Sequence, residues 1–237
     1  LPNAATRLDG GGLPAAQWTG DYTNPLSLPA PHADPFRRML AHPAVMSRLN
    51  WMLGQNFRLW GPPTARETPV GGKGQLLHGG LGWSQRGIPA DFHSYHFANG
   101  QCHAEAVNVA WQLCDQREGD GGFVVLPGSS KGHYVVPESM HHMQLTPAGL
   151  VHPHVQAGDV VLFLAYACTH GAFAWQGDDV RRGVFFQYHS RHIEQPNPIL
   201  GGFRNHYTWE SVATRLSISV SDDPRTLVSL ATAKPRL

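Results

Sequence analysis

The chain has 237 residues and a formal net charge of +1, and only 15% of its residues are charged. This length suits one substantial domain, and the sparse, balanced charge excludes a basic nucleic-acid surface, a polybasic membrane patch and an acidic tail. Three cysteines at unrelated spacings argue against a disulfide framework and favour a reducing compartment, so we expect a cytoplasmic protein. No apolar run is long enough to suggest a membrane span.

The N-terminal part of the chain changes from an irregular arm to helices. Residues 1–34 are rich in Gly, Pro, Ala and Asn without periodicity, which predicts an irregular N-terminal arm. From Pro35 to Gly54 the apolar residues recur at helical spacing. Pro43 is well placed to begin a second helix, and Gly54 is a natural residue to end it. We therefore expect two consecutive helices before the first strand.

Beyond residue 61 the pattern changes to short β runs separated by turn signals. The runs are rich in β-branched and aromatic residues and cover 75–78, 95–97, 106–114, 123–126, 160–167 and 183–188. Short strands without long helices between them predict a mainly β fold, and their order suits a double-stranded β-helix, or jelly roll. We expect a single jelly-roll domain with helical flanks at 35–217 and a C-terminal tail at 218–237.

Two segments in the second half of the chain carry the most specific pattern. Residues 119–131 read Gly-Asp-Gly-Gly-Phe-Val-Val-Leu-Pro-Gly-Ser-Ser-Lys, which is a glycine-rich turn, a β run and a Pro-Gly turn. Thr169-His170-Gly171 follows an apolar run, and Arg181 comes eleven residues after His170. This order resembles the phytanoyl-CoA dioxygenase family of Fe(II)/2-oxoglutarate-dependent oxygenases. The family usually has His where Ser130 stands, but that residue is not an iron ligand there.

The resemblance implies roles for His170 and Arg181. In the family the histidine binds iron and the arginine pairs with the far carboxylate of 2-oxoglutarate. A neutral imidazole is a suitable Fe(II) ligand, and we expect His170 at the end of a strand over 160–167 that is buried on both faces. A guanidinium can bind a carboxylate through two parallel hydrogen bonds. Strand alternation sends either Arg181 or Arg182 inward, and the family spacing favours Arg181.

The other iron ligands are less clear, because the family's His-x-Asp pair does not occur in this sequence. One hypothesis combines His78 with Asp91, in a segment, Asp-Phe-His-Ser-Tyr-His, that resembles ectoine hydroxylase. A second uses His103 and Glu105, whose side chains alternation places on the same face of a strand. A third uses His78 without a carboxylate, as in the family's halogenases, where chloride fills the open position. The fourth is a degenerate site that binds no iron.

Two further groups of residues have weaker patterns. His141-His142 and His152-Pro153-His154 look like metal sites, but they fall in a variable segment, and we expect solvated loop residues. Several aromatic residues are candidate substrate walls, namely Trp83, Tyr95, Trp111, Phe173 and Trp175. Core packing is at least as good an interpretation for Trp111.

The resemblance implies an enzyme that uses Fe(II), O2 and 2-oxoglutarate to hydroxylate a substrate, with release of succinate and CO2. Low charge and many aromatic residues favour a small, partly apolar substrate over a nucleic acid, a protein or a membrane. Two hypotheses from other classes compete with it. One is a jelly-roll binding protein that has lost its iron, and the other is a cupin-like metalloenzyme that does not use 2-oxoglutarate.

Overall fold

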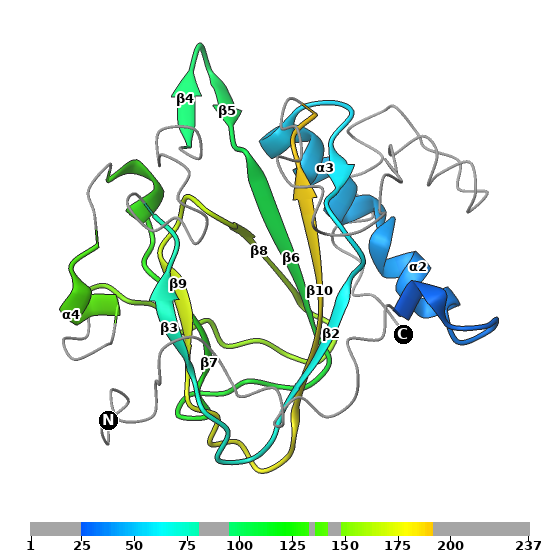
Figure 1. The fold of residues 1–237 in the computed structure, drawn as a ribbon, viewed down its shortest axis with the longest axis vertical. Coiled ribbons are helices and arrows are strands. Elements are labelled where there is room, and N and C mark those ends of the chain that lie inside the picture. Colours follow the sequence, from blue (N-terminus) through cyan, green and yellow to red (C-terminus); the bar gives the residue numbers. More distant parts are fainter. Residues whose placement is uncertain (1–24, 81–94, 133–135, 142–147, 192–237) are drawn as a thin grey trace, which may run out of the picture.

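The computed structural model describes residues 25–80, 95–132, 136–141 and 148–191 (Figure 1). Strands predominate in this part of the chain and form two antiparallel sheets and a separate hairpin. The mainly β prediction is therefore confirmed. No helix within these ranges is long and apolar enough to cross a membrane. The division of the chain into arm, domain and tail stays a prediction, because 1–24 and 192–237 lie outside the described residues.

Two helices lie before the first strand, as the periodicity predicts. These are α2 (Asp34–Leu40) and α3 (Pro43–Leu53). Each has a proline in its first turn, where the missing N–H costs no hydrogen bond. Gly54 ends α3 with φ 78°, a conformation that glycine adopts without a steric penalty. The remaining helical turns are short, namely η2 (Pro25–Ser27), η4 (Ser129–Lys131) and α4 (Glu138–His141).

The larger sheet has the order β1-β10-β6-β8, with β2 pairing along the same edge of β10 as β1. Its strands are β1 (Arg58–Leu59), β2 (Thr64–Thr68), β6 (Ala106–Gln112), β8 (Val160–Leu164) and β10 (Arg181–His189). The smaller sheet has the order β3-β9-β7, with β3 (Gln75–His78), β9 (His170–Phe173) and β7 (Gly122–Val125). The hairpin of β4 (His96–Ala98) and β5 (Gln101–His103) projects beyond both sheets in Figure 1.

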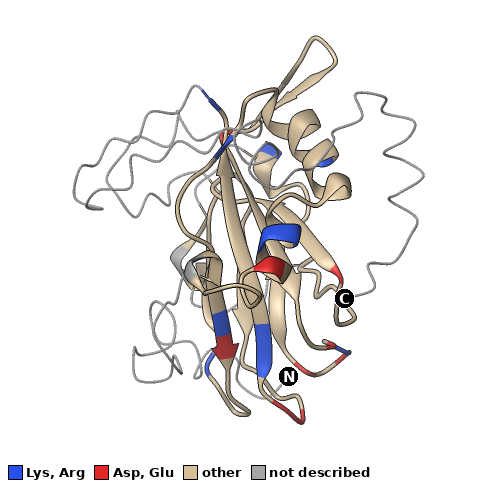
Figure 2. Cartoon of the chain, turned by 90° about the vertical axis from the view of Figure 1, so that its right-hand side faces the viewer, with Lys and Arg blue, Asp and Glu red and all other residues tan. Residues whose placement is uncertain are grey.

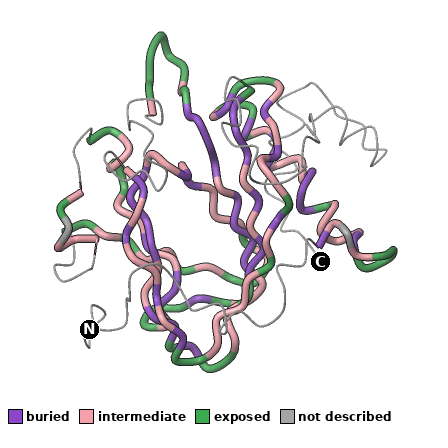
Figure 3. Tube along the Cα trace, viewed as in Figure 1, coloured by how far each residue is buried: buried purple, intermediate pink, exposed green. Residues whose placement is uncertain are grey.

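Strand alternation divides the larger sheet into two apolar environments. On β10 the side chains of Val184, Phe186 and Tyr188 pack with α2 and α3 in the main hydrophobic core. The Tyr188 hydroxyl donates a 2.8 Å hydrogen bond to the Leu40 carbonyl at the end of α2. Figure 3 shows buried residues along β6, β10 and α3, where this core lies. The opposite face of β10 is thereby left to line the space between the two sheets.

The sequence interpretation of residues 160–170 was wrong in three respects: where the strand ends, how far it is buried and which strand holds His170. The strand ends at Leu164 rather than at residue 167, because residues 165–168 turn away, with the Cys168 amide bonded to the Leu164 carbonyl. Only Phe163 of β8 is buried, so the strand is not buried on both faces. His170 does not follow this strand directly but is the first residue of β9. Apolar composition alone did not distinguish the strand from the turn after it.

Lys, Arg, Asp and Glu residues are few and scattered along the described part of the chain (Figure 2). This distribution matches the low charge of the whole sequence.

Candidate metal and co-substrate site

Two histidines face each other where the smaller sheet lines the interior. β3 and β9 pair antiparallel, with His78 directly opposite His170. The ring centroids are 4.1 Å apart and the rings are inclined by 55°. Both side chains line a cavity between the two sheets. The structure therefore brings together two of the predicted ligands, which are 92 residues apart in the sequence (170 − 78).

Backbone carbonyls orient both imidazole rings. His170 Nδ1 lies 2.9 Å from the Cys168 carbonyl oxygen, and His78 Nδ1 lies 2.7 Å from the Leu76 carbonyl oxygen. Because a carbonyl only accepts, each Nδ1 carries the hydrogen and donates. The atom of each ring that can ligate a metal is then Nε2. Metal-binding histidines commonly have such a partner, which fixes both the tautomer and the ring orientation.

Burial keeps both rings neutral. It lowers the pKa of His170 to about 3, and the repulsion that a second protonated ring beside His78 would meet acts in the same direction. Burial also lowers the pKa of His78, helped by the charges of Arg66 and His141 and opposed by its backbone hydrogen bond. A metal binds the neutral imidazole, so the rings do not need to lose a proton before they ligate at neutral pH.

Glycines allow the two histidine segments to approach backbone to backbone. A Cβ at Gly171 would lie 2.8 Å from the carbonyl oxygens of Gln75 and Leu76. A Cβ at Gly79, which has φ 77°, would overlap the Cys168 carbonyl oxygen. The glycine after each histidine is thus required by the close approach, because no side chain fits there.

The segment 119–131 packs against both His170 and Arg181. Ser129 Oγ accepts a 2.8 Å hydrogen bond from the Thr169 amide, and the Leu126 amide donates to the Thr169 carbonyl at 2.9 Å. Gly122 has φ 90°, and a Cβ there would lie 3.2 Å from Arg181 Nε. The segment therefore determines the backbone position next to the histidine and the space for the arginine.

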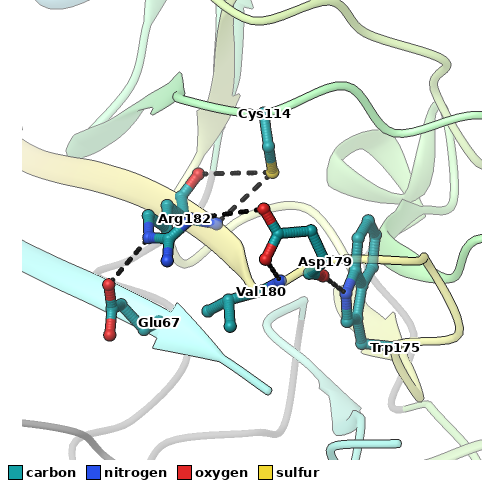
Figure 4. Close-up of polar contacts among 6 residues, drawn as sticks. All are labelled: Glu67, Cys114, Trp175, Asp179, Val180 and Arg182. Carbon is teal, nitrogen blue, oxygen red and sulfur yellow. Dashed lines mark hydrogen bonds and ion pairs between the residues drawn. The ribbon is translucent and has the colours of Figure 1, made fainter. Parts of the chain in front are cut away.

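Arg181 points into the cavity and Arg182 points away from it. Arg181 Nε is buried and has no hydrogen-bond partner among the described residues. Burial lowers the pKa of Arg181 to about 10, so the guanidinium is still charged at neutral pH. Arg182 is exposed, and its Nε donates to Glu67 Oε1 at 2.8 Å (Figure 4). The predicted alternation is confirmed, and a buried guanidinium nitrogen without a partner is suited to bind an anion.

The cavity has a volume of about 460 Å³ and lies between the sheets. The aromatic residues that line it are Trp60, Phe123, Phe163, Phe173, Trp175, Phe185 and Phe186. Its polar lining, besides the histidines and Arg181, includes Arg66, Lys73, Asn108 and Gln187. Among the described residues that line it, none is acidic. The prediction that Trp175 and Phe173 form substrate walls matches this lining.

The sequence model of the family described as phytanoyl-CoA dioxygenase (PhyH) matches residues 17–183. The chain belongs to this family. It is accordingly an Fe(II)/2-oxoglutarate-dependent oxygenase, and its cofactors are Fe(II), 2-oxoglutarate and O2. The resemblance drawn from residues 119–131 and 169–181 is thus confirmed.

Solved structures confirm the fold of this family member. HygX from Streptomyces hygroscopicus with nickel and 2-oxoglutarate bound is 20% identical, with a TM-score of 0.56 over 78% of this chain and 79% of HygX. EctD from S. alaskensis with 2-oxoglutarate and 5-hydroxyectoine is 19% identical, with a TM-score of 0.53 over 77% of this chain and 64% of EctD. A search of curated protein sequences found no match.

The described residues of this oxygenase do not include a complete set of three metal ligands. No group of three or more His, Cys, Asp and Glu side chains able to hold a metal occurs within the described ranges. Asp91 lies outside them. His103 is exposed at the end of β5, and Glu105 is buried, but neither lines the cavity. The structure therefore places His78 opposite His170 and does not bring His103 and Glu105 to the same cavity.

The expectation of solvated loop residues was wrong for His141 and, because of its burial, for His152. His141 is not a solvated loop residue, since it lies in α4, is half-buried, and its Nδ1 is 2.7 Å from the Leu77 carbonyl oxygen. His152 is half-buried, whereas His154 is exposed as expected, and their rings contact each other with centroids 5.4 Å apart. His142 lies outside the described residues. Sequence gave no sign of these positions, because the contacts come from distant segments.

Trp111 and Tyr95, two of the other candidate substrate walls, do not line the cavity. Trp111 is buried in the main core with α2 and α3, which agrees with the core-packing interpretation. Tyr95 is not among the residues that line the cavity. Trp83 lies outside the described residues. The lining residues that sequence analysis missed include the polar Asn108 and Gln187, and strand alternation in β6 and β10 is the signal that could have found these two.

Proposed function

We propose that this chain is a hydroxylase of a small, partly apolar molecule that uses Fe(II) and O2 and converts 2-oxoglutarate to succinate and CO2. The observation that carries the proposal is the placement of His78, His170 and Arg181 around one cavity. A metal ligated by the two imidazoles and an anion bound by the guanidinium would then share this space.

The residues present fit Fe(II) and 2-oxoglutarate. Two neutral imidazoles with fixed tautomers supply nitrogen ligands of the type that Fe(II) accepts. Arg181 offers a buried guanidinium nitrogen for the far carboxylate of the co-substrate. When bound, the iron and 2-oxoglutarate would together supply the oxidation of a substrate C–H bond by O2. The part of the protein would be to position the reactants.

Among the hypotheses for the iron ligands other than His170, the geometry favours His78. It stands directly opposite His170, whereas His103 and Glu105 do not line the cavity. We propose Asp91 as the carboxylate, on its resemblance to the ectoine hydroxylase segment. His78, Asp91 and His170 would then form the two-histidine, one-carboxylate set typical of this chemistry.

The cavity walls support a small, partly apolar substrate. Aromatic rings from both sheets would bury its apolar part and exclude water from the reacting bond. Asn108 and Gln187 lie opposite each other on β6 and β10 and both line the cavity, so their carboxamides can orient a polar group. The similar structures are described with small molecules, namely HygX with hygromycin B and EctD with 5-hydroxyectoine.

The ligand assignment is tested by Fe(II) affinity in matched variants. We expect His78→Ala, Asp91→Ala and His170→Ala each to weaken Fe(II) binding by about two orders of magnitude or more, because each removes a direct ligand. His103→Ala and Glu105→Ala should bind Fe(II) like the unchanged protein. If Glu105→Ala loses Fe(II) affinity and Asp91→Ala does not, the carboxylate ligand is Glu105 and not Asp91.

A halogenase-like site is the second candidate. Gly80 stands two residues after His78, where the family's His-x-Asp pair would have its carboxylate, and a Cβ there would lie 2.8 Å from Thr169 Oγ1. On this hypothesis chloride takes the third position. If so, Asp91→Ala leaves Fe(II) affinity unchanged, and added chloride changes the spectrum of the Fe(II)–2-oxoglutarate complex. A spectrum insensitive to chloride, with weak Fe(II) binding by Asp91→Ala, excludes it.

A further inference from the structure

Asn108 and Gln187 place two carboxamides side by side on the wall of the cavity. The two residues are directly opposed on β6 and β10, so they share a face of the larger sheet, with Cβ atoms about 4.5–5.5 Å apart. Both residues are partly buried. Neither carboxamide makes a hydrogen bond within the described part of the chain. Each therefore keeps both its N–H donors and its carbonyl acceptor for another partner.

Two glutamines nearby show how the protein treats carboxamides that serve only its own structure. Gln112 lies on the same face of β6 as Asn108, and Gln112 and Gln116 are both buried. Gln112 Nε2 donates to the Ala110 carbonyl at 3.0 Å, and Gln112 Oε1 accepts a hydrogen bond from Gln116 Nε2. These carboxamides are satisfied internally, as buried polar groups usually are. The contrast indicates that the unbonded pair on the cavity wall is available to a ligand.

An aromatic residue flanks the pair on each side. The Trp60 amide donates a 2.8 Å hydrogen bond to the Gln187 carbonyl, and Asn108 is opposite Phe163 of β8. Trp60 and Phe163 both line the cavity. Because neighbouring strands lie about 4.8 Å apart, the four residues form a row across the sheet. A polar group that binds the two carboxamides therefore has an apolar ring on either side of it.

This row reaches one of the metal-binding histidines and lies away from Arg181. The Phe163 ring lies 4.6 Å from the His170 ring, measured between centroids. Gln187 comes six residues after Arg181 on β10 (187 − 181), which is about 20 Å along an extended strand. Under the proposed function the co-substrate runs from Arg181 to the metal and does not need the carboxamides. The pair is thus left to the prime substrate.

We propose that Asn108 and Gln187 bind a carboxamide or lactam group of the prime substrate, so that the substrate class is a small, uncharged, partly apolar amide. This inference rests on the proposed function, because it assigns Arg181 to the co-substrate and the histidines to the metal. An amide donates through its N–H and accepts through its C=O, which matches two carboxamides that each do both. A ketone only accepts, so it would leave a carboxamide oxygen of the site unpaired.

The test compares para-fluorobenzamide with para-fluoroacetophenone, in which a methyl group replaces the NH2 group. Both probes have an apolar ring and a carbonyl, but only the amide donates hydrogen bonds. Titrations followed by 19F NMR, on protein loaded with Mn(II) and saturated with 2-oxoglutarate, measure both affinities. We expect the amide to bind about tenfold or more tightly than the ketone, and unlabelled benzamide to displace it. Since the row reaches His170, the paramagnetic Mn(II) should also increase the relaxation rate of the bound fluorine.

Matched variants assign the binding to the pair. Gln187→Met and Asn108→Leu keep the approximate size of the side chain and remove the carboxamide. Each should weaken amide binding about tenfold and ketone binding less. Gln101→Met and Asn50→Leu are the controls, because both residues are exposed and neither lines the cavity. The control variants should bind both probes like the unchanged protein.

The outcomes separate this inference from the proposed function. Equal affinities for the amide and the ketone in the unchanged protein, or no saturable binding of the amide, would overturn the amide site. Undiminished amide binding in folded Gln187→Met and Asn108→Leu would also overturn it. If neither variant folds, the unchanged protein decides, because a bound amide whose relaxation Mn(II) does not increase lies elsewhere. A protein that binds neither Mn(II) nor 2-oxoglutarate contradicts the proposed function, and the same two probes then test the amide site on metal-free protein.

Discussion

Ser129 Oγ accepts a 2.8 Å hydrogen bond from the backbone amide of Thr169, the residue just before His170. Ser129 belongs to the Pro-Gly-Ser turn, 40 residues earlier in the chain. The two most specific sequence segments are therefore in direct contact. This contact gives the serine of the turn a physical role, which is to hold the backbone from which a metal-binding histidine projects.

Ser129→Ala should weaken Fe(II) binding without abolishing it. The substitution leaves the Thr169 amide without its partner, which costs about 1–3 kcal/mol. Loosening the support of a metal ligand typically lowers metal affinity about 10- to 100-fold. Fe(II) titration and thermal unfolding of the same sample measure both effects. Ser130→Ala is the control, and an equal loss in both variants would contradict a specific role for Ser129.

Gly171→Ala should destabilise the fold by steric overlap. The new Cβ would lie 2.8 Å from two backbone carbonyl oxygens of β3, and backbone cannot move aside as a flexible side chain can. Overpacking of this kind costs about 1–3 kcal/mol, which chemical denaturation can measure. Gly61→Ala is the matched control, since a Cβ there meets nothing within 4 Å. Equal free energies of unfolding for the two variants would show that β3 and β9 are not packed as described.

Arg181→Lys should impair binding of 2-oxoglutarate while leaving Fe(II) binding intact. A lysine keeps the charge but cannot donate two parallel hydrogen bonds to a carboxylate. We expect the 2-oxoglutarate affinity to fall about tenfold or more. Arg182→Lys, on the exposed face and paired with Glu67, should have no such effect. A 2-oxoglutarate affinity that survives in Arg181→Lys would favour a cupin-like enzyme that does not use this co-substrate.

Cys168 should resist alkylation in the folded protein. Burial raises the pKa of its thiol to about 12, and the thiol donates to the Leu164 carbonyl at 3.0 Å. Because the pKa is raised, the reactive thiolate is scarce at pH 8, and labelling by iodoacetamide should be far slower than in urea. Mass spectrometry of the labelled peptides measures the rates. Equal rates with and without urea would mean that Cys168 is exposed in solution.

Sequence reasoning found the elements whose signals are local. The proline and glycine at the ends of α3 predicted its bounds, and the alternation in β10 predicted that one of two adjacent arginines points inward. The glycines after His78 and His170 were visible in the sequence, but the structural reason for glycine at these positions was not. Only the pairing of β3 with β9 shows that each glycine meets the backbone of the other segment.

The elements that sequence reasoning missed depend on distant partners. β2 reads Thr-Ala-Arg-Glu-Thr, with little apolar content, and it forms a strand because it pairs with β10. Arg66 was missed with it, since its place in the cavity follows from the register rather than from a motif. The turn after β8 was likewise hidden in an apolar run.

The central claim is that His78, His170 and Arg181 hold Fe(II) and 2-oxoglutarate together. It is tested most directly by an anaerobic titration of metal-free protein with Fe(II) and 2-oxoglutarate, followed by the visible charge-transfer band of the chelate. The account predicts a band in the unchanged protein that is lost in His170→Ala and in His78→Ala, and that needs more 2-oxoglutarate in Arg181→Lys. Folded protein that gives no band, or a band that persists in His170→Ala, would contradict it.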